Sequence, residues 1–206
     1  MNQLIKMSVP ISLLIYLSVS YVDRPVSLFI HDCLYRNRHW SAWTSSLPDT
    51  LLLIVLMISV ASAGLYFYRK KRSVLDTDTR LLGFIALTLP TVYIAKSLLK
   101  FLAGRVETRY WLQHRQLYEF HWLHGGENFN GFPSGHMLVF ATLFAAIARY
   151  HAGQRLLCYS LLGVLALLLV ATNYHFVGDV LAGLYLGLLL ESSMDRFYAR
   201  NDSLLN

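Results

Sequence analysis

The chain has 206 residues, of which 55% are hydrophobic and only 15% are charged, with a formal net charge of +6. This composition and the mean hydropathy of +0.44 exclude an ordinary soluble domain and indicate an integral membrane protein. The positive charge does not predict a nucleic-acid partner, because no basic stripe with interleaved aromatic residues and no known binding motif accompanies it. At roughly 20 residues for each bilayer-spanning helix, the length predicts one membrane-embedded domain over residues 1–206, with about six spans.

Six apolar runs predict an all-α bundle of six transmembrane helices. Their approximate bounds, in chain order, are 4–22, 51–68, 81–99, 135–150, 156–172 and 177–194. The first run carries Lys6 near its start, as a signal peptide would, but the run is long and no small residues mark a cleavage position after it. These features favour an uncleaved span. Residues 23–49 mix aromatic residues with cations and are typical of either an interfacial helix or a solvated loop.

The orientation of the bundle is indicated by four consecutive cations at residues 69–72, directly after the second run. Clusters of this kind stay on the cytoplasmic side of a membrane, so alternation of six spans predicts that both termini are cytoplasmic. Five further cations then fall on the same side: Lys6, Arg149, Arg155, Arg196 and Arg200. The opposite face receives polar residues from three distant segments: Lys100, Arg105, Arg109, His136, His175 and Asp179.

The fourth run is preceded by Phe-Pro-Ser-Gly-His at residues 132–136. Proline suits the first turn of a helix, and the exposed amides of a helix N-terminus bind anions. We expect a phosphate to contact the backbone amides of Ser134 and Gly135 and the serine hydroxyl, while His136 donates or accepts a proton. The alternative is that Pro-Ser-Gly only begins a helix and that His136 is an interfacial residue.

His175 and Asp179 are four residues apart at the start of the sixth run. On a helix this spacing places both on one face, where the carboxylate can hold one imidazole nitrogen and leave the other as a nucleophile. The alternative is a helix cap, in which Asp179 stabilises the helix N-terminus without any catalytic role.

Cations gather where the third run ends, at Lys100, Arg105 and Arg109. Ammonium and guanidinium groups match phosphate oxygens and neutralise charge during phosphoryl transfer. The alternative is snorkelling of long side chains at the membrane edge, to which, or to an internal ion pair, we assign Lys96.

A metal site is a weaker hypothesis. Its candidate ligands lie in the loop between the third and fourth runs: His114, His121, His124, Glu107, Glu119 and Glu127. No recognised ligand spacing joins them, so no metal is expected.

Taken in order, these segments resemble the motifs of the type 2 phosphatidic acid phosphatase family, membrane lipid phosphatases related to the vanadium haloperoxidases. The resemblance covers about residues 96–185, and the six-span organisation extends it over nearly the whole chain. Pro-Ser-Gly-His at residues 133–136 matches the central motif of that family without change, and residues 175–183 resemble its final motif.

The resemblance implies roles for individual residues. His175 would be the nucleophile that forms a phosphohistidine, Asp179 would orient it, and His136 would protonate the leaving group. Ser134 and Gly135 would bind the phosphate. Water would hydrolyse the intermediate, and no cofactor would be required.

Two positions depart from the family pattern. After Lys-x-x-x-Gly-Arg the family usually has a second arginine followed by proline, whereas here Arg105 is followed by Val-Glu-Thr-Arg. The final motif usually has Ser-Arg with the arginine six residues before its histidine, but here Leu168 and Leu169 occupy these positions. Three residues are candidates to replace the missing cation: Arg109, Arg115 and Asn173.

The predicted function is therefore a membrane lipid phosphatase whose site faces the periplasm of a bacterial inner membrane. Undecaprenyl diphosphate, phosphatidic acid, phosphatidylglycerol phosphate and lipid A phosphates all fit as substrates within the bilayer. One alternative is a phosphotransferase on the same scaffold, which shares the first half-reaction. Another is a non-catalytic lipid-binding protein. The sequence carries no signal for the oligomeric state.

Overall fold

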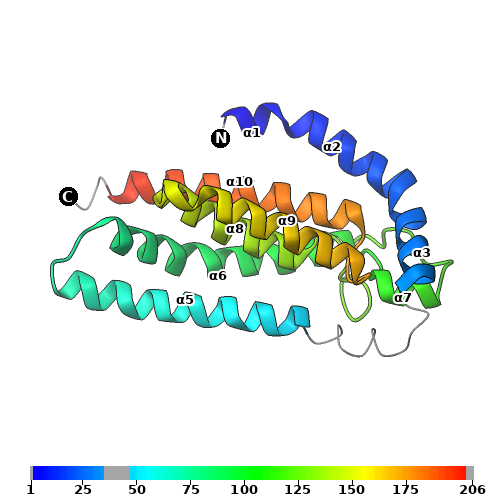
Figure 1. Cartoon of the computed structure of the whole chain (residues 1–206), viewed down its shortest axis with the longest axis horizontal. Helices are drawn as coiled ribbons and strands as arrows, with labels where there is room; N and C mark the ends of the chain where they lie inside the picture. Colours follow the sequence, from blue (N-terminus) through cyan, green and yellow to red (C-terminus); the bar gives the residue numbers. More distant parts are fainter. Residues whose placement is uncertain (1, 35–46, 203–206) are drawn as a thin grey trace.

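A computed structural model describes residues 2–34 and 47–202, and within these ranges the chain is helical without any strand (Figure 1). The N-terminal segment contains α1 (Asn2–Lys6), α2 (Ser8–Leu17), a π-helical turn η1 (Ser18–Val22) and α3 (Asp23–Leu34). The remaining helices are α5 (Leu47–Lys71), α6 (Thr77–Ala103), α7 (Thr108–Gln113), α8 (Gly135–Tyr150), the 3₁₀ turn η2 (Ala152–Gln154), α9 (Arg155–Ala171) and α10 (Val177–Asp202). The all-α prediction is confirmed for the described residues.

Five helical stretches are long and apolar enough to cross a bilayer, which makes the chain an integral membrane protein. They are Ser8–Cys33, Leu52–Lys71, Thr77–Ala103, Ala152–Ala171 and Val177–Arg200. The fourth predicted span, 135–150, coincides with α8, an apolar helix of 16 residues that is shorter than the other five. The count of six spans and the cytoplasmic termini stay predictions.

Helix ends differ from the predicted bounds where polar residues are accommodated. The first span was predicted to end at residue 22, but the helix continues into α3 because the charged Asp23 is buried there and paired with Arg105. The third was predicted to begin at 81, but α6 begins at Thr77 because the side chain of Asp76 accepts a hydrogen bond from the Thr79 amide. Residues 23–34 of the ambiguous segment are helical, whereas 35–46 lie outside the described residues.

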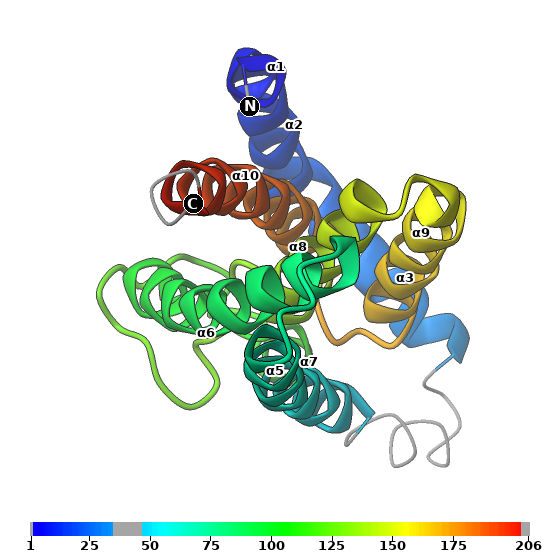
Figure 2. The ribbon, with the colours of Figure 1, turned by 90° about the vertical axis from the view of Figure 1, so that its left-hand side faces the viewer.

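α8 is the central helix, packed between α6, α9 and α10 (Figures 1 and 2). One face of α8 packs on α5 and α6 through a cluster that contains Val55, Ile85, Leu89, Val92, Leu138, Val139 and Leu143. Another face packs on α9 and α10 through Met137, Ala141, Leu162, Leu165, Leu169 and Val180. A helix that is apolar on all sides is stable only when it is surrounded, and α8 fulfils this condition.

Two glycines of α10 allow its backbone to lie against α8. A Cβ atom at Gly183 would lie 2.5 Å from the carbonyl oxygen of Ser134, and one at Gly187 would lie 2.5 Å from that of Leu138. Small residues permit such close approach between membrane helices. The approach holds the N-terminal ends of α8 and α10 together, and these ends carry the two motif histidines.

We expect Gly187→Ala to destabilise the protein by about 1–3 kcal/mol, because the added methyl group meets backbone that must shift. Gly163→Ala in α9 is the matched control, since nothing lies within 4 Å of the new Cβ atom. Unfolding of the detergent-solubilised protein measures both variants. Equal stability of the two would contradict the close α8–α10 contact.

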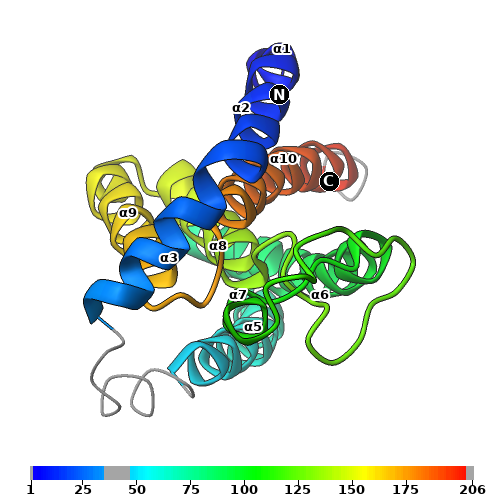
Figure 3. The same ribbon diagram turned by 90° about the vertical axis from the view of Figure 1, so that its right-hand side faces the viewer.

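The two ends of the bundle differ in character. At one end, ion pairs join the helices, including Arg69–Asp76 at 2.8 Å, His151–Asp78 at 3.2 Å and Arg149–Glu191 at 2.6 Å. At the other end α3, α7 and the connection between α6 and α8 come together (Figure 3). Arg69 and Arg149, which were predicted to be cytoplasmic, thus lie at the opposite end of the bundle from the motif histidines.

Candidate active site

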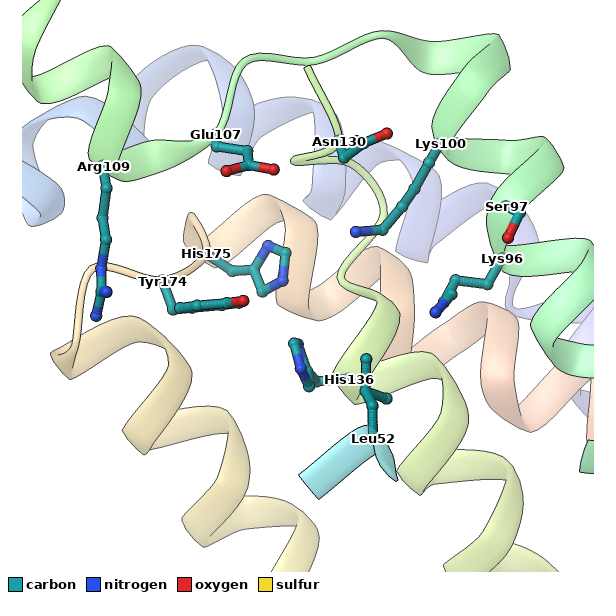
Figure 4. A pocket seen from close by; sticks show the side chains of 10 residues that line it. All are labelled: Leu52, Lys96, Ser97, Lys100, Glu107, Arg109, Asn130, His136, Tyr174 and His175. Carbon is teal, nitrogen blue, oxygen red and sulfur yellow. The ribbon is translucent and has the colours of Figure 1, made fainter. Parts of the chain in front are cut away.

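A cavity of about 390 Å³ opens at the α3–α7 end of the bundle (Figure 4). Its walls come from α5, α6, α7, the loops on either side of α7, α8 and the turn before α10. The lining residues are Leu52, Lys96, Ser97, Lys100, Glu107, Arg109, Asn130, His136, Tyr174 and His175. Lys96, Lys100 and Arg109 outnumber the single carboxylate, Glu107, so the cavity is positively charged and suits an anionic ligand.

The two motif histidines meet in this cavity. The ring centroids of His136 and His175 are 5.9 Å apart, and both side chains project toward the same space (Figure 4). The ring of Tyr174 contacts both, at 5.2 Å and 5.3 Å between centroids. Segments about forty residues apart in sequence therefore place two imidazoles around one ligand position.

His175 is held by the turn that follows α9. The amides of Tyr174 and His175 both donate to the carbonyl oxygen of Leu169, and Asn173 adopts the left-handed conformation, with φ of 48°. Neither ring nitrogen of His175 makes a well-formed hydrogen bond within the described part of the chain. Burial, together with the positive charge of Lys100, holds the pKa of His175 well below its usual value. A neutral imidazole at physiological pH is the form that can attack phosphorus.

Asp179 makes the helix-capping contact and also lies near His175. Its Oδ2 atom accepts a hydrogen bond of 3.1 Å from the amide of Phe176, immediately before α10, as a helix-capping carboxylate does. The same oxygen lies 3.7 Å from Nδ1 of His175, within ion-pair range but longer than a hydrogen bond. The carboxylate is thus placed to stabilise a cationic ring.

Arg105 does not lie where the sequence predicted. It was expected to clamp phosphate, but its side chain is fully buried and is not among the lining residues of the cavity. One guanidinium nitrogen donates to Asp179 at 2.5 Å, and the other donates to Asp23 and to the Tyr118 hydroxyl, both at 2.8 Å. Burial alone would lower the pKa of Arg105, but the charges of Asp179 and Asp23 outweigh it and raise this pKa.

The N-terminus of α8 also differs from the expectation. The Ser134 amide, predicted to face phosphate, donates instead to the backbone carbonyl of Asp179 at 2.9 Å, and the serine hydroxyl caps the amide of Met137. Gly135 lies against two lysine stems: a Cβ atom there would be 2.7 Å from Cδ of Lys96 and 3.2 Å from Cε of Lys100. Glycine at this position leaves room for both lysines to cross the helix end.

Six lining residues were missed from the sequence: Leu52, Lys96, Ser97, Glu107, Asn130 and Tyr174. Lys96 carried a usable signal, since it precedes Lys100 by four residues on one helix and therefore shares its face. Instead it was assigned to snorkelling or an internal ion pair. Glu107 was considered only as a metal ligand, and nothing in its spacing indicated that it faces the cavity.

The candidates to replace the missing family arginine lie in different places. Leu169 itself is buried in the α8–α9 core. Arg109 lines the cavity, where its guanidinium donates to the carbonyl of Thr172 at 3.0 Å and lies 5.2 Å from the ring centre of Tyr174. The Asn173 amide group is bonded to Ser27, and Arg115 is not among the lining residues. Arg109 is therefore the candidate that the fold favours.

The three loop histidines pack against aromatic rings. The ring of His114 stacks on Tyr110 at 4.2 Å, whereas His121 and His124 lie 4.9 Å and 5.5 Å from the ring centre of Phe129. Within residues 2–34 and 47–202, no group of three or more His, Cys, Asp or Glu side chains is arranged to hold a metal ion.

Comparison with known proteins provides independent information. The model of the family described as the PAP2 superfamily matches residues 80–201. No curated protein matches the chain. A crystal structure described as the first transmembrane PAP2-type phosphatidylglycerolphosphate phosphatase, from Bacillus subtilis, is similar, with a TM-score of 0.53 and 23% sequence identity. The alignment covers 93% of this chain and 96% of that one, and it shows that the two share a fold.

Proposed function

Because the chain belongs to the PAP2 superfamily, we propose that it is a membrane phosphatase that hydrolyses lipid phosphates or diphosphates. The observation that carries the proposal is the convergence of His136 and His175 on one cationic cavity at an end of the helix bundle. A phosphate ester needs a nucleophile, a proton donor and positive charge at a single point, and this cavity provides all three.

The proposed reaction has two displacements. In the first, the free ring nitrogen of His175 attacks phosphorus, the bond between phosphorus and the lipid oxygen breaks, and His136 protonates the departing oxygen. In the second, His136 removes a proton from water, which attacks the phosphohistidine and releases inorganic phosphate. Asp179 stabilises the positive charge that develops on the ring of His175, from which it is 3.7 Å away.

The cations of the cavity complete the proposed mechanism. Lys96, Lys100 and Arg109 neutralise the equatorial oxygens as the phosphoryl group transfers. Hydrolysis of phosphate monoesters has one of the highest uncatalysed barriers, so the complete site must supply on the order of 20 kcal/mol. Nucleophile, acid and cations together are the sources of such a contribution.

The proposed substrate is a lipid because the cavity belongs to a membrane bundle and Leu52 of α5 forms part of its wall. Undecaprenyl diphosphate, phosphatidic acid, phosphatidylglycerol phosphate and lipid A phosphates all present a phosphate on an apolar anchor. The predicted topology places the cavity on the periplasmic face of a bacterial inner membrane.

The buried Leu169, where the family usually has arginine, favours one alternative, a lipid-binding protein without turnover. That alternative predicts binding of phospholipid analogues without phosphate release. A phosphotransferase would instead deliver the phosphoryl group from His175 to an acceptor lipid.

The test is a panel of the four lipid phosphate classes, presented to the full-length protein in detergent and assayed for released phosphate. His175→Ala and His136→Ala serve as blanks. Trapping of a labelled phosphohistidine excludes the non-catalytic alternative, and product analysis with an added acceptor lipid detects phosphotransfer. Absence of both phosphate release and phosphotransfer for every lipid would overturn the proposal.

A further inference from the structure

We propose that Asp23, in the N-terminal helical segment, is a positioning residue of the phosphatase site and acts through Arg105 on the Asp179–His175 pair. The inference rests on the proposed function. Asp23 lies outside residues 80–201, which carry the family match, and 156 residues separate it from Asp179 in the chain.

Asp23 is buried, and both of its carboxylate oxygens accept hydrogen bonds. Its side chain is 0% exposed, and its two carboxylate oxygens have different partners. Oδ1 accepts from the amide of Gly178 in the first turn of α10, and Oδ2 accepts from Arg105, each at 2.8 Å. The Tyr118 hydroxyl accepts from Arg105 and donates to the carbonyl of Val19, one turn before Asp23.

Arg105 links the two carboxylates. One of its terminal nitrogens donates to Asp23 and the other to Oδ1 of Asp179. A guanidinium group favours a bidentate pair with a single carboxylate, so a second carboxylate is needed to keep Arg105 from taking both oxygens of Asp179. Because Asp23 occupies one nitrogen, Oδ2 of Asp179 stays on the side of His175, 3.7 Å from Nδ1.

The charges of Asp23, Arg105 and Asp179 also support a positioning role for Asp23. Asp23, Arg105 and Asp179 form a fully buried group of one guanidinium and two carboxyl groups, which has one positive and two negative charges when both carboxyls are ionised. When His175 attacks phosphorus, its ring becomes cationic, and the net negative charge of the group compensates it. Without the charge of Asp23, the group would be neutral before attack, and the cationic ring would be stabilised less.

A purely structural role would also place Asp23 here, since its bond to Gly178 fixes the N-terminal segment on α10. The two roles differ in their kinetic effects. Loss of structure would disturb the cavity and raise KM, whereas loss of positioning lowers kcat alone. Asp23 does not line the cavity, so substrate binding should not depend on it.

The experiment measures kcat and KM of full-length Asp23→Asn in detergent, alongside its thermal unfolding. Asparagine keeps an acceptor for Gly178 but removes the charge. We expect kcat to fall about 10- to 100-fold, the usual effect of a group that orients another, while KM stays equal or falls slightly. Ser8→Ala is the matched control, because it removes a 2.6 Å hydrogen bond between the N-terminal segment and Tyr185 of α10 without touching Arg105. Its kcat should equal that of the wild type.

Tyr118→Phe provides a second variant, in case Asp23→Asn does not fold. It removes a hydroxyl that contacts Arg105, Oδ2 of Asp23 and the carbonyl of Val19, and it leaves every charge in place, so kcat should fall several-fold at constant KM. The inference is overturned if a folded variant keeps the wild-type kcat, if KM rises instead, or if Ser8→Ala shows the same loss. Wild-type protein that neither releases nor transfers phosphate overturns the proposed function and the inference together, whereas an active wild type with equally active variants overturns the inference alone.

Discussion

His175→Ala is expected to abolish phosphate release, with a loss of about 10⁴-fold or more, because no other group can form the covalent intermediate. His136→Ala is expected to cost about 10²- to 10⁴-fold, the usual contribution of a general acid. Phosphate release by the purified protein on the best lipid of the panel measures both effects. Unchanged thermal unfolding of each variant would show that the loss is chemical.

His121→Ala is the matched control for these two variants. His121 belongs to the same end of the bundle, but it packs against Phe129 and does not line the cavity. Its rate should remain within a few-fold of the wild type. A near wild-type rate for His175→Ala would remove the proposed mechanism, whatever the other variants do.

The lowered pKa of His175 gives this site a specific pH dependence. In the proposed mechanism the neutral ring attacks, so kcat/KM should fall on the acid side only when the pH passes through the folded pKa, which lies below the ordinary histidine value of about 6.5. Lys100 lowers this pKa through its charge. Lys100→Met should therefore move the acid limb to higher pH, besides raising KM. If the acid limb of the kcat/KM profile does not move in Lys100→Met, the titration that it reflects is not that of His175.

Arg105→Gln is expected to destabilise the fold by about 3–5 kcal/mol. Removing the guanidinium leaves Asp23 and Asp179, both fully buried, without their shared counter-ion. Denaturant unfolding in detergent measures the loss. Activity should disappear as well, because Asp179 loses the partner that fixes its position.

Arg109→Gln is the matched comparison, since it removes an arginine that lines the cavity and contacts the Tyr174 ring. It should raise KM and change the stability by less than about 1 kcal/mol. If Arg105→Gln instead raises KM and unfolds like the wild type, Arg105 is a phosphate ligand, as the sequence alone predicted.

The general architecture could be predicted because hydrophobicity is a local property. Apolar runs of the right length identify membrane helices, and the family resemblance is confirmed by the match over residues 80–201. The meeting of His136 and His175 could be predicted from the alternation of the spans. His136 begins the fourth apolar run and His175 precedes the sixth, and two spans that run in the same direction begin on the same face of the membrane. The structure brings the two rings within 5.9 Å.

The function of individual charges could not be predicted, because it depends on contacts between distant residues. Arg105 has the motif spacing of a phosphate ligand, and only the position of Asp23, 82 residues earlier, shows that it binds carboxylates instead. The first span was predicted to end at residue 22, so Asp23 was not predicted to belong to the site. The Ser134 amide was predicted to bind phosphate because it lies at a helix N-terminus. Its acceptor is the backbone carbonyl of Asp179, which the close approach of α10 brings near it.

The shortness of α8 has a consequence for the route by which a lipid arrives. Sixteen residues rise only about 24 Å, less than the roughly 30 Å of hydrocarbon in a typical bilayer. We therefore expect the proposed catalytic centre, which lies at the first turn of α8, to be deeper in the bilayer than the plane of the surrounding headgroups. A phosphorylated lipid would then enter laterally from the bilayer and insert its headgroup into the site, while its acyl or prenyl tails remain in the leaflet throughout the reaction.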